Sequence, residues 1–123
     1  MKLARLDGVD LEYDAVGSGE PLLLIHGSFV AGDSYVPLVT EPSLAGRWRM
    51  IRYHRRGYVG SSRATPPFTI GQQAADARAL LGHLGISRAH VAGHSYGGAI
   101  AIQLTLDAPE PTAAPPSTSS WMR

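Results

Sequence analysis

The pattern of apolar and polar positions changes along the chain. Near the N-terminus the two kinds of residue alternate over residues 3–6 and 9–14, on either side of the dipeptide Asp7-Gly8. Alternation around Asp-Gly predicts a hairpin of two half-buried strands. Residues 22–25 are instead all apolar, which is typical of a strand buried on both faces of a parallel sheet. Two further strands are predicted at residues 47–54 and 89–93.

Helical periodicity is clearest from Thr69 to Gly85 (TIGQQAADARALLGHLG). The apolar residues of this segment return every three or four positions and fall on one helical face. Thr69 and Gln72 have the spacing of a capping box, and Gly85 suits the C-terminal end. The residues expected on the apolar face are Ile70, Ala74, Ala77, Leu80, Leu81 and Leu84. A second helix is predicted over residues 96–107 and a short, broken one around residues 35–45.

Strands and helices therefore alternate along the chain. This order predicts an α/β fold with a mostly parallel sheet, flanking helices and an N-terminal hairpin. We assign residues 1–108 to this domain. Residues 109–123 are rich in Pro, Ser, Thr and Ala and show no periodicity, so we expect a disordered tail.

Composition narrows the classes of function. The chain has 123 residues, which suits one small domain, and its formal charge of +1 gives no reason to expect a nucleic-acid or membrane partner. It has no cysteine, which excludes disulfides and thiolate metal sites, and we expect neither metal nor cofactor. The N-terminus has no apolar segment of the signal-peptide type, so a cytoplasmic location is predicted.

The motif with the clearest chemistry is Gly-His-Ser-Tyr-Gly at residues 93–97, between a predicted strand and a predicted helix. In this context Gly-x-Ser-x-Gly is typical of a nucleophile elbow, a strained turn that exposes a serine hydroxyl. Small residues are needed at Gly93 and Gly97 because the turn brings two backbones close together. The alternative is a glycine-rich turn without catalytic function.

A second motif, Leu-Leu-Leu-Ile-His-Gly-Ser, ends at Ser28. An oxyanion hole needs one backbone amide from the residue after the nucleophile and one from the loop after a neighbouring strand. Tyr96 supplies the first amide in this interpretation. Ser28 is the better choice for the second and Phe29 the less suitable one, while Gly27 lets the loop turn over the serine.

These two motifs, together with RYHRRGYVGSS at residues 52–62, resemble the α/β-hydrolase family from residue 3 to about residue 108. The resemblance implies that Ser95 is the nucleophile, that the amides of Tyr96 and Ser28 form the oxyanion hole, and that the substrate is a small ester or related acyl compound. It also implies a structural role at the site for His26, Gly27, Gly93, His94, Gly97 and Gly98.

The chain departs from the family pattern in two places. His54 stands where many relatives have aspartate. The catalytic acid and the late histidine of the family are not found after Pro109. None of the five histidines is expected to replace the missing base; His54 is the least unsuitable of them, but its loop is usually structural. Asp76 is expected at the surface. Arg55 and Arg56 are expected to be loop contacts or solvated charges, with anion binding as the less favoured alternative.

We therefore interpret the chain as the N-terminal half of a serine hydrolase, truncated and weak or inactive alone. The alternatives are a catalytically silent fragment or interaction module that keeps the fold, and complementation by a second polypeptide. The strand at residues 89–93 is expected to form an unprotected edge and to favour self-association. Residues 111–123 contain no Val, Leu or Ile, an abrupt change that favours a shifted reading frame.

Overall fold

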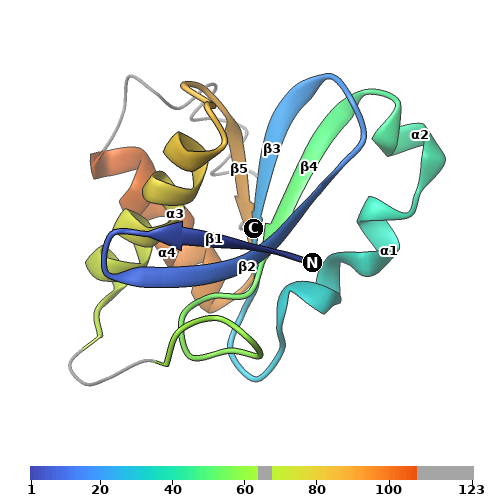
Figure 1. Cartoon of the computed structure of the whole chain (residues 1–123). Helices are drawn as coiled ribbons and strands as arrows, with labels where there is room; N and C mark the ends of the chain where they lie inside the picture. Colours follow the sequence, from blue (N-terminus) through green and yellow to red (C-terminus); the bar gives the residue numbers. More distant parts are fainter. Residues whose placement is uncertain (64–67, 108–123) are drawn as a thin grey trace.

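Five strands form one sheet in the order β1-β2-β4-β3-β5 (Figure 1). The computed structural model describes residues 1–63 and 68–107, so the tail predicted at residues 109–123 lies outside the described residues. The strands are β1 Lys2–Leu6, β2 Val9–Val16, β3 Glu20–Ile25, β4 Trp48–Tyr53 and β5 His90–Gly93. The helices are the 3-10 helix η1 Gly32–Tyr35, α1 Val36–Val39, α2 Pro42–Ala45, α3 Ile70–His83 and α4 Tyr96–Asp107.

The sheet is mixed. The hairpin strands β1 and β2 are antiparallel, and β2 is also antiparallel to β4. Strand β3 lies parallel to both β4 and β5. The α/β fold class and the N-terminal hairpin are thus confirmed, and within the described residues β5 is an edge strand.

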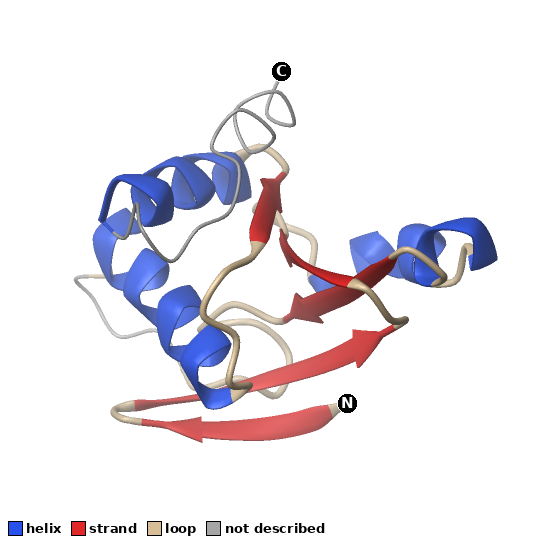
Figure 2. Ribbon diagram, turned by 90° about the horizontal axis from the view of Figure 1, so that it is seen from above, coloured by secondary structure: helices blue, strands red, loops and turns tan. Residues whose placement is uncertain are grey.

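Helices cover both faces of the sheet, with α3 and α4 on one side and η1, α1 and α2 on the other (Figures 1 and 2). Strand β3 shows why its sequence is continuously apolar. Leu23 and Ile25 pack in the core beneath α3 and α4, whereas Leu24 packs in the opposite core with Tyr35 and Val39. Alternate side chains of this strand therefore enter two different cores.

The ends of α3 follow the predicted signals in part. The Thr69 hydroxyl oxygen accepts a hydrogen bond from the Gln72 amide at 3.0 Å, and Gly85 adopts a left-handed φ of +71° after the helix. The return bond of the capping box is not formed, because Gln72 Oε1 has no partner among the described residues. In residues 1–63 and 68–107 no helix is long and apolar enough to cross a bilayer.

Candidate active site

Strands β3, β4 and β5 run in the same direction, so their carboxyl ends lie at the same end of the sheet. A histidine directly follows each of these strands. His26 follows β3, His54 follows β4 and His94 follows β5. Ser95 comes next in the chain and precedes α4. The carboxyl ends of parallel strands are where α/β sheets place their ligand sites, so the topology brings the candidate residues to the expected edge.

Ser95 occupies a strained turn. Its φ of +56° lies in the left-handed region, which costs roughly 1–3 kcal/mol for a residue with a side chain. The turn is held by hydrogen bonds from the Gly97 amide to the His94 carbonyl (2.9 Å) and from the Gly98 amide to the Ser95 carbonyl (2.8 Å). Ser95 is solvent-exposed. Ser95 therefore lies on a strained and exposed turn between β5 and α4.

Glycines 93 and 97 are required by close backbone contacts around this turn. A Cβ at Gly97 would overlap the carbonyl oxygens of Ile25 and His26, and a Cβ at Gly93 would overlap the backbone of Gly97. The end of β3, the end of β5 and the start of α4 thus touch through backbone atoms alone. This arrangement keeps Ser95 at a fixed position relative to the loop after β3.

The loop after β3 approaches the serine directly. A Cβ at Gly27 would lie 3.2 Å from the Ser95 Cβ and 3.2 Å from His94 Nδ1. Phe29 follows with a left-handed φ of +63° and an exposed side chain. Within the described residues the amides of Ser28 and Tyr96 donate no hydrogen bond.

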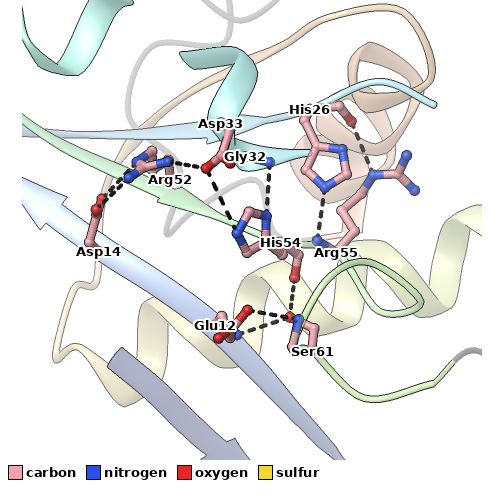
Figure 3. A network of polar contacts seen from close by, with 10 residues as sticks. Glu12, Asp14, His26, Gly32, Asp33, Arg52, His54, Arg55 and Ser61 are labelled. Carbon is pink, nitrogen blue, oxygen red and sulfur yellow. Dashed lines mark hydrogen bonds and ion pairs between the residues drawn. The ribbon is translucent and has the colours of Figure 1, made fainter. Parts of the chain in front are cut away.

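Two buried histidines connect this loop to the loop after β4 in a reciprocal manner (Figure 3). His26 Nε2 accepts a hydrogen bond from the Arg55 amide at 2.9 Å, and His54 Nδ1 accepts one from the Gly32 amide at 3.0 Å. Each ring thus holds the backbone of the other strand's loop. We call this pair the histidine clamp.

Both clamp histidines must be neutral to accept these bonds. Burial lowers the pKa of His26 to about 4, with Arg55 and His54 adding in the same direction and the bond to the Gly27 carbonyl opposing them. Burial also lowers the pKa of His54, against the opposing effect of Asp33. His54 is thus a structural acceptor, and the suggestion that it acts as the base receives no support from this geometry.

The other histidines do not complete a catalytic pair. His83 is exposed at the end of α3. His90 is partly buried and contacts Glu20 (3.1 Å) and, in an edge-to-face arrangement, the Trp48 ring. Within residues 1–63 and 68–107 no hydrogen bond joins Ser95 to any histidine, and no three His, Cys, Asp or Glu side chains gather in a way that could hold a metal ion.

The loop after β4 is fastened to the hairpin strand β2. The Ser61 hydroxyl donates to the His54 carbonyl at 2.6 Å and accepts from the Glu12 amide at 2.9 Å (Figure 3). On the other side of His54, Arg52 binds Asp14 and Asp33 at 2.8 Å each. These contacts leave the loop few ways to move away from the site.

The expectation for Asp76 was wrong, whereas the structure decides between the two alternatives given for Arg55. Asp76 is not a surface residue, because it is 6% exposed and pairs with Arg56 at 2.7 and 2.8 Å. Arg55 is a loop contact and not a solvated charge, because it is only 3% exposed. Its guanidinium donates to the His26 carbonyl (3.0 Å) and to Gln73 (2.5 Å).

Sequence reasoning missed the roles of Gln73 and Asp76. They lie three positions apart beside the apolar face of α3, and both are buried. Their spacing places them on one side of the helix. The sequence signal that could have suggested partners for them is the pair of consecutive arginines, Arg55 and Arg56.

A surface groove of about 470 Å³ lies between the two loops and the start of α4. It is lined by Ser28, Phe29, Arg55, Arg56, Gly57, Tyr58, Arg63, Phe68 and Tyr96. The groove therefore contains both residues whose amides are candidates for the oxyanion hole. We call it the basic groove.

Comparisons with known proteins agree with this geometry. Residues 20–114 match the family model described as alpha/beta hydrolase fold. The protein named "Putative carbamate hydrolase RutD" of Azorhizobium caulinodans is 34% identical over 123 residues, which are 100% of this chain and 46% of that protein. The chain thus spans about half the length of this curated relative.

Two solved structures are similar in fold. The structure titled "Epoxide hydrolase CorEH without ligand" superposes with a TM-score of 0.84 at 30% identity, covering 90% of this chain and 38% of that one. The structure titled "Est816 as an N-Acyl homoserine lactone degrading enzyme" gives a TM-score of 0.81 at 32% identity, covering 90% and 42%.

Proposed function

The chain belongs to the α/β-hydrolase family, and from this membership we propose that it carries the nucleophile and oxyanion hole of a serine hydrolase acting on an ester or related acyl substrate. The observation that supports this most is Ser95, an exposed serine with a left-handed φ at the strand-to-helix turn. Such a costly conformation is typical of functional positions.

The proposed chemistry is acyl transfer through Ser95. Its hydroxyl oxygen attacks the carbonyl carbon, and the negative charge that develops on the carbonyl oxygen is stabilised by the amides of Ser28 and Tyr96. The bond to the alcohol then breaks, and the alcohol leaves with a proton. Water hydrolyses the acyl-enzyme, which releases the acid and restores the serine.

A base for the Ser95 proton is the part that the described residues do not supply. No histidine among them is hydrogen-bonded to Ser95, and two of the three strand-end histidines, His26 and His54, serve in the clamp. The oxyanion amides and binding alone leave only a small part of the rate of an intact triad. We therefore expect slow turnover by the chain alone.

A catalytically silent protein that keeps the fold is the second candidate, and the lack of a base among the described residues favours it.

Three expectations from the sequence stay predictions: the tail at residues 109–123, the cytoplasmic location and the self-association through β5.

Hydrolysis of p-nitrophenyl butyrate separates the two candidates. We expect slow turnover that Ser95→Ala removes. Ser34→Ala is the matched control, because it deletes the hydroxyl of an exposed serine on η1 that does not line the basic groove. Turnover that is equal in wild type and Ser95→Ala would favour the silent protein.

A further inference from the structure

We propose that the basic groove binds a carboxylate on the acyl group of the substrate, with Arg55 as its main ligand. This inference deepens the proposed function, since it names the class of acyl group: one that carries a terminal carboxylate, as in the monoester of a dicarboxylic acid.

Arg55 is a buried cation whose partners are all neutral. It is 3% exposed and donates to the carbonyl oxygen of His26, the amide oxygen of Gln73 and the hydroxyl of Tyr58. A guanidinium has five N–H donors, so these bonds leave one donor on each terminal nitrogen. Two donors of this kind match the two oxygens of a carboxylate.

The charges of two nearby arginines are neutralised by carboxylates, whereas the charge of Arg55 is not. Arg56 is paired with Asp76, and Arg52 is paired with Asp14 and Asp33. Within residues 1–63 and 68–107 no carboxylate lies within ion-pair distance of Arg55. A buried charge without a counter-ion is costly.

Aromatic rings compensate for part of that cost. The guanidinium carbon of Arg55 lies 4.8 Å from the centroid of the Tyr58 ring and 5.0 Å from that of Tyr96. Contacts of this type are attractive, and more so where the cation is desolvated. The rings therefore hold the cation in place without neutralising it, and the net positive charge is left for a ligand.

The groove places this charge beside the reaction site. None of the described residues that line it is Asp or Glu. Arg63 adds a second cation at its exposed rim, and it has no ion-pair partner within residues 1–63 and 68–107. Ser28 and Tyr96 line the same groove, so an acyl group whose carbonyl reaches their amides has its far end near Arg55. The volume of about 470 Å³ is in the range of small-molecule sites.

Binding can be measured without turnover. We would titrate the ¹⁵N-labelled chain with glutarate and with glutaramide, its neutral analogue, and follow the amides of Ser28 and Tyr96 and the Arg55 Nε–H by NMR. We expect saturable shifts with glutarate and an affinity for glutaramide at least about tenfold lower. Equal binding of the two compounds, or no binding of glutarate, would overturn the proposal.

Variants assign the effect to the groove. Arg55→Gln should abolish glutarate binding, and Arg63→Gln should weaken it without disturbing a buried residue. Arg47→Gln is the matched control, because Arg47 is exposed and precedes β4 at the opposite edge of the sheet. If Arg55→Gln fails to fold, Arg63→Gln decides: affinity equal to that of the control variant overturns the proposal.

The measurement is repeated in Ser95→Ala. Because this variant has no Ser95 hydroxyl, glutarate binding that persists in it supports the basic groove whatever the outcome of the esterase assay. Loss of esterase activity and loss of glutarate binding are thus separate results.

Discussion

Acidification should destabilise the fold through His26. The folded chain lowers the pKa of this residue to about 4 from an ordinary value of 6.5. Between these two values the unfolded chain binds the proton and the folded chain does not, so the free energy of unfolding decreases as the pH falls. The contribution of His26 is fully present above pH 6.5 and is lost as the pH approaches 4.

The structure gives the size of the effect. The full difference in pKa corresponds to about 3 kcal/mol, and about 2 kcal/mol of it is lost between pH 7.5 and pH 5.0. Protonation at Nε2 would remove the acceptor of the Arg55 amide, which is the physical reason for the cost. His54 contributes in the same direction, because burial lowers its pKa also.

Urea unfolding followed by circular dichroism at the two pH values measures this quantity. His26→Gln is the matched variant, because a glutamine oxygen can accept from the Arg55 amide but does not titrate. We expect a loss of stability about 2 kcal/mol smaller in the variant than in the wild type. If both chains lose the same stability, His26 is not the neutral acceptor described above.

Three further variants test the role of burial in ion pairing and the expected self-association. Asp76→Asn should cost about 3 kcal/mol in the free energy of unfolding, because Arg56 would lose its counter-ion at a position where the side chains are 12% and 8% exposed. Asp10→Asn should cost less than about 0.5 kcal/mol, since its pair with Arg5 is largely solvated; equal costs in urea unfolding would refute the role of burial. Self-association through the β5 edge and α4 should be visible by sedimentation velocity and reduced by Leu106→Glu, because Leu106 is 69% exposed on α4; a wild-type chain that sediments as a monomer would contradict this.

Features that depend on neighbouring residues were predictable from the sequence. The elbow is a run of five residues between a strand and a helix, and α4 spans the predicted residues 96–107. The alternation of β3 between two cores follows from its continuous apolar run. In each case the local pattern determines the structure because few other conformations satisfy it.

The contacts that shape the basic groove were not predictable in this way. Arg56 and Asp76 are twenty positions apart, and His26 and Arg55 are twenty-nine positions apart. Nothing in the local pattern of α3 distinguishes a solvated Asp76 from a buried one. Only the approach of the loop after β4 to α3, which the sheet order brings about, decides where these charges lie.

The role of Ser95 is tested most directly by labelling with a fluorophosphonate probe followed by peptide mapping. We expect Ser95 to be the most reactive serine of the chain, because its hydroxyl is exposed on a strained turn beside two amides that donate to no described residue. Labelling should be slow, since no histidine among the described residues is hydrogen-bonded to Ser95 to take the proton. A label found mainly on another serine, or one unchanged in Ser95→Ala, would show that Ser95 is not the nucleophile.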